Sequence, residues 1–195
     1  MKLVIASNNK YKLKEIKEIL SGYFDEIVSM KEAGISHETV EDGTTFMENA
    51  VKKARETAEL SGCAALADDS GICVDALGGA PGIYSARFCG RHGDDAENNR
   101  LLLSKMEGVT DRKAHYTCAI ALCYPDGRKV TAEEYFYGEI AHDEKGEYGF
   151  GYDPLFYLPE YGCTSAEILP EEKNRISHRA KALRALCEKL SAEQA

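Results

Sequence analysis

The segment from Tyr116 to Tyr124 constrains the fold most, because it is a nearly continuous run of residues that favour β-strands. It ends at Pro125-Asp126-Gly127, a sequence typical of turns. Lys129 to Ile140 then alternates loosely between apolar and polar residues. These segments predict a hairpin of two antiparallel strands.

Strands and helices alternate in the earlier part of the chain. Leu13, Ile16 and Leu20 recur at helical spacing, and Thr45 is a suitable N-cap for a second amphipathic segment. This early alternation of strands and helices, together with the antiparallel hairpin, predicts a three-layer α/β fold around a mixed, twisted central sheet. The length of 195 residues favours a single domain, residues 1–195. The expected strands are 3–6, 27–30, 64–67, 116–124 and 129–140, and the expected helices are 11–20, 45–60, 94–106 and one beginning at 177.

Composition limits the function classes. A chain of 195 residues, 44% of them hydrophobic, can bury a substantial core. Its net charge of -9 argues against stable nucleic-acid binding, although a local basic cluster could still attract a small anion. Seven cysteines, without C-x-x-C spacing, favour reduced thiols, and no apolar segment is long enough for a signal peptide or a membrane span. We therefore expect a soluble cytoplasmic protein.

The expected strand at 64–67 runs directly into Asp68-Asp69-Ser70-Gly71. At a junction between strand and loop, the chain could turn both carboxylates towards one place, where they would suit Mg²⁺. An ordinary turn has the same composition, and this motif alone favours the turn. An acidic loop at Glu38, Glu41 and Asp42 is, by itself, typical of a solvated surface.

Three other segments could bind parts of an anionic ligand. The loop before the first helix could bind phosphate through its N–H groups and lysines, and a simple N-cap is an equally good interpretation. Gly149 to Pro154 could bring aromatic faces to a base, although packed aromatics in a turn would look the same. Ser177-His178-Arg179, with Lys173, could meet an anion or carbonyl at a helix start, or could lie on the surface. Neither a P-loop nor a G-x-G-x-x-G sequence after a strand occurs.

Taken together, these segments resemble, in order and spacing over nearly the whole chain, the inosine triphosphate pyrophosphatase family. The segments that carry the resemblance are Ser7, Asn9 and Lys12 of an S-x-N-x-x-K pattern, Thr45–Ala50 with Lys53, Ala67–Gly71, Gly78–Arg87, Gly149–Pro154 and Ser177–Arg179.

The resemblance implies an elongated two-lobed fold with a deep active-site cleft, a homodimer, and Mg²⁺-dependent cleavage of inosine, deoxyinosine and xanthosine triphosphates between the α- and β-phosphates. It implies Asp69 as general base, with Asp69, Glu41 and Asp68 in the metal and water network. The implied substrate-binding residues are Ser7, Asn8, Asn9, Lys10, Tyr11, Lys12 and Lys53 for the triphosphate, and Ser70, Phe150, Gly151, Tyr152, Asp153, Lys173, His178 and Arg179 for the nucleoside.

Two alternatives remain at this point. A related pyrophosphatase that prefers modified pyrimidines would share the fold, but the Phe150–Asp153 and Ser177–Arg179 segments argue against it. A nucleotide-binding regulator without catalysis is disfavoured by the intact pair of aspartates.

Overall fold

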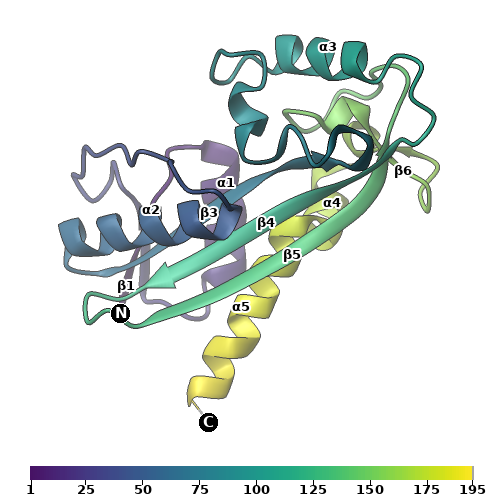
Figure 1. Cartoon of the computed structure of the whole chain (residues 1–195). Coiled ribbons are helices and arrows are strands. Elements are labelled where there is room, and N and C mark those ends of the chain that lie inside the picture. The colour runs from purple at the N-terminus through teal and green to yellow at the C-terminus, as the bar shows by residue number, and fades with distance from the viewer. Residues whose placement is uncertain (195) are drawn as a thin grey trace. The chain divides into compact units, whose positions relative to one another are not determined.

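The computed structural model describes residues 1–194, except for the side chains of Tyr11, Gln194 and residue 193. Its described elements form a mixed α/β fold (Figure 1). The strands are β1 (Lys2–Ile5), β2 (Glu26–Ser29), β3 (Ala64–Val74), β4 (Lys113–Cys123), β5 (Lys129–Ile140), β6 (Phe156–Leu158) and β7 (Cys163–Thr164). The helices are α1 (Lys10–Leu20), α2 (Phe46–Ser61), α3 (Asp95–Lys105), α4 (Pro170–Ile176) and α5 (His178–Gln194), and four short 3₁₀ helices accompany them.

The strands form one sheet in the order β2-β1-β3-β4-β5-β6-β7. β1 is parallel to β2 and β3, whereas β6 is antiparallel to β5 and β7, so the predicted mixed sheet is confirmed. The predicted hairpin is also present, because the N–H of Tyr124 donates to the carbonyl of Arg128 at 2.9 Å across the turn. By its internal contacts the chain divides into two compact units, which are described separately below.

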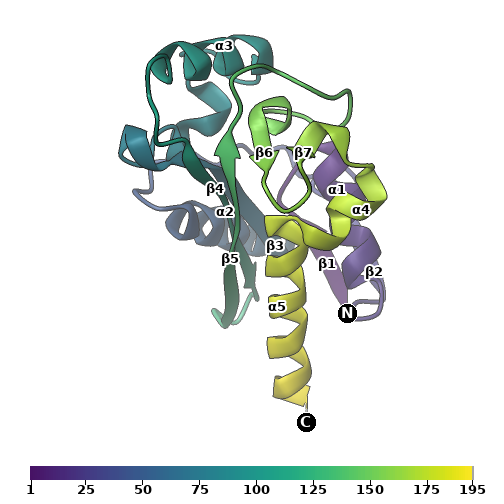
Figure 2. The same ribbon diagram turned by 90° about the vertical axis from the view of Figure 1, so that its right-hand side faces the viewer.

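The first unit comprises Met1–Asp69, Cys118–Glu134 and the C-terminal segment from Arg179. Its strands carry a hydrophobic cluster on each face. Ile16 of α1 and Leu183 of α5 pack against one face, and α5 can be followed beside the strands in Figure 2. Ala50 and Ala54 of α2 pack against the other face. This unit therefore has the predicted three layers of helix, sheet and helix.

Helix α2 begins and ends where its sequence predicts. The Thr45 hydroxyl accepts from the N–H of Glu48, and the Glu48 carboxylate accepts in return from the N–H of Thr45, which is a capping box. Gly62 closes the helix with φ of 63°, a left-handed conformation that favours glycine. Because the buried face of α2 carries alanines, its backbone approaches the sheet closely.

Strand β3 corrects one prediction. It does not end at residue 67 but continues to Val74, so Asp68 and Asp69 lie within a strand and not at a turn. Side chains alternate along a strand, and the neighbouring residues follow this rule. Leu66 belongs to the cluster beneath α1 and α5, and Ala67 belongs to the cluster beneath α2. The two carboxylates consequently point to opposite faces of the sheet.

The second unit comprises Ser70–Thr117 and Tyr135–His178. Its core gathers Leu102 of α3 with Ile72 of β3, Tyr116 of β4 and Phe156 of β6. The predicted helix at 94–106 is confirmed as α3, which Asp94 caps by accepting from the N–H of Glu97. Helix α4 is not among the expected elements. It ends at Ile176 and is capped by Ser177, whose N–H donates to the carbonyl of Lys173 at 2.9 Å. Helix α5 begins at the next residue, His178.

All seven cysteines are free thiols, and Cys118 and Cys123 are buried. Among residues 1–194, no helix combines the length and apolarity that a membrane span requires.

Candidate functional site

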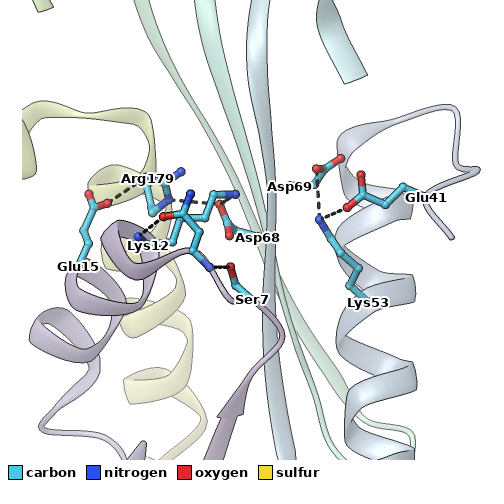
Figure 3. Close-up of polar contacts among 9 residues, drawn as sticks. Ser7, Lys12, Glu15, Glu41, Lys53, Asp68, Asp69 and Arg179 are labelled. Atoms are coloured by element: carbon cyan, nitrogen blue, oxygen red, sulfur yellow. Dashed lines mark hydrogen bonds and ion pairs between the residues drawn. The ribbon is translucent and has the colours of Figure 1, made fainter. Parts of the chain in front are cut away.

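Asp69 lies on the α2 face of β3, where Asn49 and Lys53 of that helix reach it. Figure 3 shows the contact with Lys53. Its Oδ2 accepts from Asn49 Nδ2 at 3.1 Å, and its Oδ1 lies 3.3 Å from Lys53 Nζ. Lys53 Nζ also donates to Glu41 Oε1 at 2.8 Å. The structure thus brings together three residues that the sequence nominated, Asp69, Glu41 and Lys53.

The loop that carries Glu41 is fastened to α2 at several points. Asp42 pairs with Lys52 at 2.6 Å, and the N–H of Gly43 donates to Asn49 Oδ1 at 2.8 Å. The next residue, Thr44, donates both its N–H and its hydroxyl to Glu48. These contacts hold the acidic loop against the helix, although its composition alone suggests only a solvated surface.

The environment of Asp69 makes its carboxylate unusually basic. Burial raises the pKa of Asp69, and the nearby negative charge of Glu41 adds to this effect, so that the pKa is raised despite Lys53. Burial alone would lower the pKa of Lys53, but the negative charges of Asp69, Asp68 and Glu41 outweigh burial and raise it. Lys53 therefore stays protonated beside a carboxylate that binds a proton more readily than usual.

Asp68 lies on the other face of β3, in a buried network of balanced charge. Its Oδ2 pairs with Lys12 Nζ at 2.9 Å and with Arg179 Nε at 3.2 Å, while Arg179 NH1 reaches Glu15 Oε2 at 2.9 Å. Burial alone would raise the pKa of Asp68, but Lys12 and Arg179 lower it well below its usual range. Asp68 is thus a permanently charged partner for two cations, and Figure 3 shows its separation from Asp69.

The loop from Ser7 to Lys12 forms the start of α1. The N–H of Asn9 donates to Ser7 Oγ, and the N–H of Lys12 donates to Asn9 Oδ1, each at 3.2 Å. Asn9 therefore caps the helix, while Asn8, Asn9 and Lys10 remain exposed. The predicted role of the Tyr11 side chain lies outside the described residues.

In the second unit, Asp153 collects several donors. Its Oδ2 accepts from the N–H of Phe150 at 2.8 Å and pairs with Lys173 Nζ, and Ser165 Oγ donates to its other oxygen at 3.2 Å. Lys173 Nζ also lies 5.2 Å from the centre of the Phe150 ring. The structure thus assembles Phe150, Asp153 and Lys173, with the Phe150 ring partly exposed.

Other nominated residues of this unit have mainly structural contacts. The Tyr152 ring is buried in the core, and its hydroxyl donates to the carbonyl of Ser85 at 2.7 Å. Gly151 bonds through its N–H to Asp95 and through its carbonyl to Asn99. The packed-aromatic interpretation is therefore correct for Tyr152. Ser70 is half-buried in β3.

His178 stacks on Tyr116, with ring centres 4.7 Å apart and planes at 5°. His178 is also buried, although a histidine in a first helical turn is typical of the surface. Sequence reasoning missed Tyr116, and it likewise missed Asn49 and Glu15. Asn49 lies inside a recognisable motif, but nothing in the sequence marks Tyr116 or Glu15.

No group of three His, Cys, Asp or Glu side chains converges as a metal-binding set within the part of the chain that the structure describes. The three carboxylates nominated for metal are divided by the sheet, with Glu41 and Asp69 on the α2 face and Asp68 on the other.

Comparison with known proteins gives consistent matches. Residues 3–189 match the model of the Ham1 family. The chain is 54% identical over 193 residues to a dITP/XTP pyrophosphatase of Desulforamulus reducens, covering 98% of this chain and 96% of that protein. It is 49% identical to a dITP/XTP pyrophosphatase of Clostridium perfringens, covering 97% of each. Among solved structures, the Staphylococcus aureus Ham1 protein matches with a TM-score of 0.91 and 40% identity, covering 99% of this chain and 100% of that one.

Proposed function

This chain belongs to the Ham1 family, and we propose that it is a nucleoside triphosphate pyrophosphatase that hydrolyses dITP, XTP and ITP to the nucleoside monophosphate and pyrophosphate. The observation that carries the proposal at the level of the site is the group of Asp69, Glu41 and Lys53. It offers a basic carboxylate, a second carboxylate and a protonated amine in one place, as hydrolysis of a phosphoanhydride requires.

We propose Mg²⁺ as the cofactor, with Glu41 and Asp69 as the residues that would hold it. These carboxylates already share one cation, the ammonium of Lys53. Burial is the main cause of the raised pKa of Asp69, and repulsion by the carboxylate of Glu41 adds to it. Two carboxylates are enough, because Mg²⁺ keeps several waters and shares substrate phosphates. Bound there, the ion would supply charge neutralisation and a more acidic water.

In the proposed reaction Asp69 accepts a proton from the attacking water. The water oxygen bonds to phosphorus, and the P–O bond between the α-phosphate and the leaving pyrophosphate breaks. Lys53 and Lys12, with the loop from Ser7, bind the phosphate oxygens and offset their charge. Asp68 acts indirectly, because it pairs with Lys12 and fixes the position of the Lys12 amine.

We propose that Phe150, Asp153, Lys173 and His178 bind the nucleoside, through stacking and through polar groups that suit a 6-keto purine. Such groups would leave the 6-amino group of adenine badly paired. Gly151 and Tyr152 support that segment through the backbone and core contacts described above. Ser70 stays a proposed nucleoside-binding residue. The contacts of Arg179 with Asp68 and Glu15 favour a role in holding the Lys12 network rather than contact with the base.

The resemblance further supports a homodimer, and the seven free thiols support a cytoplasmic location.

The test is to incubate the purified chain with dITP and Mg²⁺ and to identify the products. We expect dIMP and pyrophosphate in equal amounts, without dIDP or orthophosphate, and a kcat/KM for dITP at least about 100-fold above that for dATP. Faster hydrolysis of a modified pyrimidine triphosphate would overturn the purine assignment. Binding of dITP without any turnover would overturn catalysis.

A further inference from the structure

We infer that Asn49 is a positioning residue that fixes Asp69 and the acidic loop relative to each other through the two ends of one amide group. The inference rests on the proposed function of Asp69. Asn49 Nδ2 donates to Asp69 Oδ2 at 3.1 Å, and Asn49 Oδ1 accepts from the N–H of Gly43 at 2.8 Å. The side chain is fully buried, with 0% of its surface exposed, so water does not compete for either bond.

The chemistry of the two partners fixes the orientation of the amide. A backbone N–H only donates, and an ionised carboxylate only accepts. Rotating the amide by half a turn would set the NH₂ group of Asn49 against the N–H of Gly43, and its oxygen against Asp69. Both contacts would then be repulsive in a buried site, where an unmade hydrogen bond is costly. Asn49 therefore has one satisfied orientation.

Asn49 and Lys53 connect the same two parts of the chain in different ways. They lie four residues apart on α2 and so share one face of the helix. Lys53 joins Glu41 to Asp69 by charge, at 2.8 and 3.3 Å. An ammonium that also binds phosphate exchanges its partners during turnover, whereas the neutral amide of Asn49 has no such competing role. Asn49 is consequently the lasting connection.

Gly43 shows how closely the loop approaches α2. A Cβ atom at this position would lie 2.6 Å from Asn49 Oδ1 and 2.9 Å from the Cβ of Glu48. Its φ is not in the left-handed region, so the space beside Asn49, and not backbone conformation, is what requires glycine here.

The isosteric variant Asn49→Asp separates the two bonds. It keeps an oxygen for the N–H of Gly43 but places an acceptor where Asp69 needs a donor. We expect kcat for dITP to fall about 100-fold, with KM changed less than about threefold, because Asp69 is misplaced while substrate contacts remain. Hydrogen exchange of the Gly43 amide should stay slow in Asn49→Asp and become fast in Asn49→Ala, which removes both bonds.

Thr57→Val is the matched control, because Thr57 is a buried polar residue of α2 whose hydroxyl donates to Met30 Sδ at 4.0 Å and not to Asp69 or Gly43. It should keep wild-type kcat. If Asn49→Asp does not fold, Gly43→Ala displaces the loop from the other side and should lower kcat in the same way.

A kcat of Asn49→Asp within threefold of wild type would overturn the inference. So would equal Gly43 exchange in wild type and Asn49→Ala. Wild-type turnover of dITP is measured first. Its absence would refute the proposed function alone, since Gly43 exchange still reports the connection.

Discussion

Asp68 and Asp69 are consecutive residues of β3, yet their carboxylates pair with cations on opposite faces of the sheet, Arg179 of α5 and Lys53 of α2. The division follows from strand geometry, because successive side chains alternate. It also gives the two residues opposite electrostatic properties. The pKa of Asp68 is lowered, because Lys12 and Arg179 outweigh its burial, and that of Asp69 is raised by burial and by Glu41. The pair therefore comprises one structural anion and one candidate base.

Asp69→Asn should abolish turnover without unfolding the protein. The amide cannot accept the proton from water, so we expect kcat for dITP to fall about 1000-fold. Burial disfavours the charged form of Asp69, and Lys53 keeps Glu41 as a partner, so the free energy of unfolding should change by no more than about 1 kcal/mol. Steady-state kinetics and urea unfolding measure both. Near-wild-type turnover at saturating Mg²⁺ and dITP would refute the role.

Asp68→Asn should instead be a stability variant. Lys12 and Arg179 would keep their buried positive charges without the carboxylate between them, which should lower the free energy of unfolding at pH 7 by about 3 kcal/mol. Urea unfolding measures this loss. A smaller decrease in the free energy of unfolding for Asp68→Asn than for Asp69→Asn would contradict the prediction.

The pH dependence of the free energy of unfolding tests the direction of the pKa shift of Asp68. The folded-state pKa of Asp68 lies below its unfolded value, because Lys12 and Arg179 outweigh burial. Its stabilising contribution is thus complete above about pH 4 and is lost as the pH falls towards the folded-state pKa. The difference between wild type and Asp68→Asn should be constant near neutral pH and should narrow below about pH 4. A stability difference between wild type and Asp68→Asn that widens in acid would show that the pKa of Asp68 is raised in the folded state.

Phe150→Ala should weaken binding of the base. The Phe150 ring is partly exposed and lies beside Lys173, so it offers a face to a purine. Loss of one stacking contact should raise KM for dITP about 10-fold and leave kcat within about twofold. Tyr148→Ala, which removes an exposed aromatic ring two residues earlier, is the control and should change neither value. Equal effects of the two substitutions would argue against a specific contact by Phe150.

The elements that were predicted correctly are those whose signals are local. Helix α2 carries its own N-cap at Thr45 and its own C-cap at Gly62, and the hairpin carries its own turn. The end of β3 was predicted wrongly because Asp68-Asp69-Ser70-Gly71 has the composition of a turn. The charge of Asp68 is tolerated inside a strand because of Arg179, which lies 111 residues further along the chain. Local composition cannot reveal such a partner.

In the candidate site, too, the features with a signal in the sequence were predicted, and those that depend on the folded chain were not. Asp69, Glu41 and Lys53 were nominated through several segments that occur together in one order, and the structure brings them into contact. Asn49 was overlooked because its function depends on the distance from α2 to Gly43 and Asp69, which only the folded chain sets. The sequence leaves open whether Tyr152 offers a face to a base or packs in a turn, because an exposed and a buried tyrosine look alike in sequence, and the structure buries it.

Removal of Mg²⁺ should abolish turnover, and Glu41 should set the concentration needed to restore it. We expect EDTA to reduce hydrolysis of dITP to background and excess Mg²⁺ to recover it.

Glu41 and Asp69 are the two carboxylates that share Lys53, so Glu41→Gln removes one of two candidate oxygen ligands. The half-saturating Mg²⁺ concentration should rise about 10-fold or more, because lost ligands and their neighbours weaken metal sites by this order. Asp42→Asn is the control, since Asp42 is the next residue of the loop but pairs with Lys52. An equal Mg²⁺ requirement in wild type, Glu41→Gln and Asp42→Asn would place the metal elsewhere.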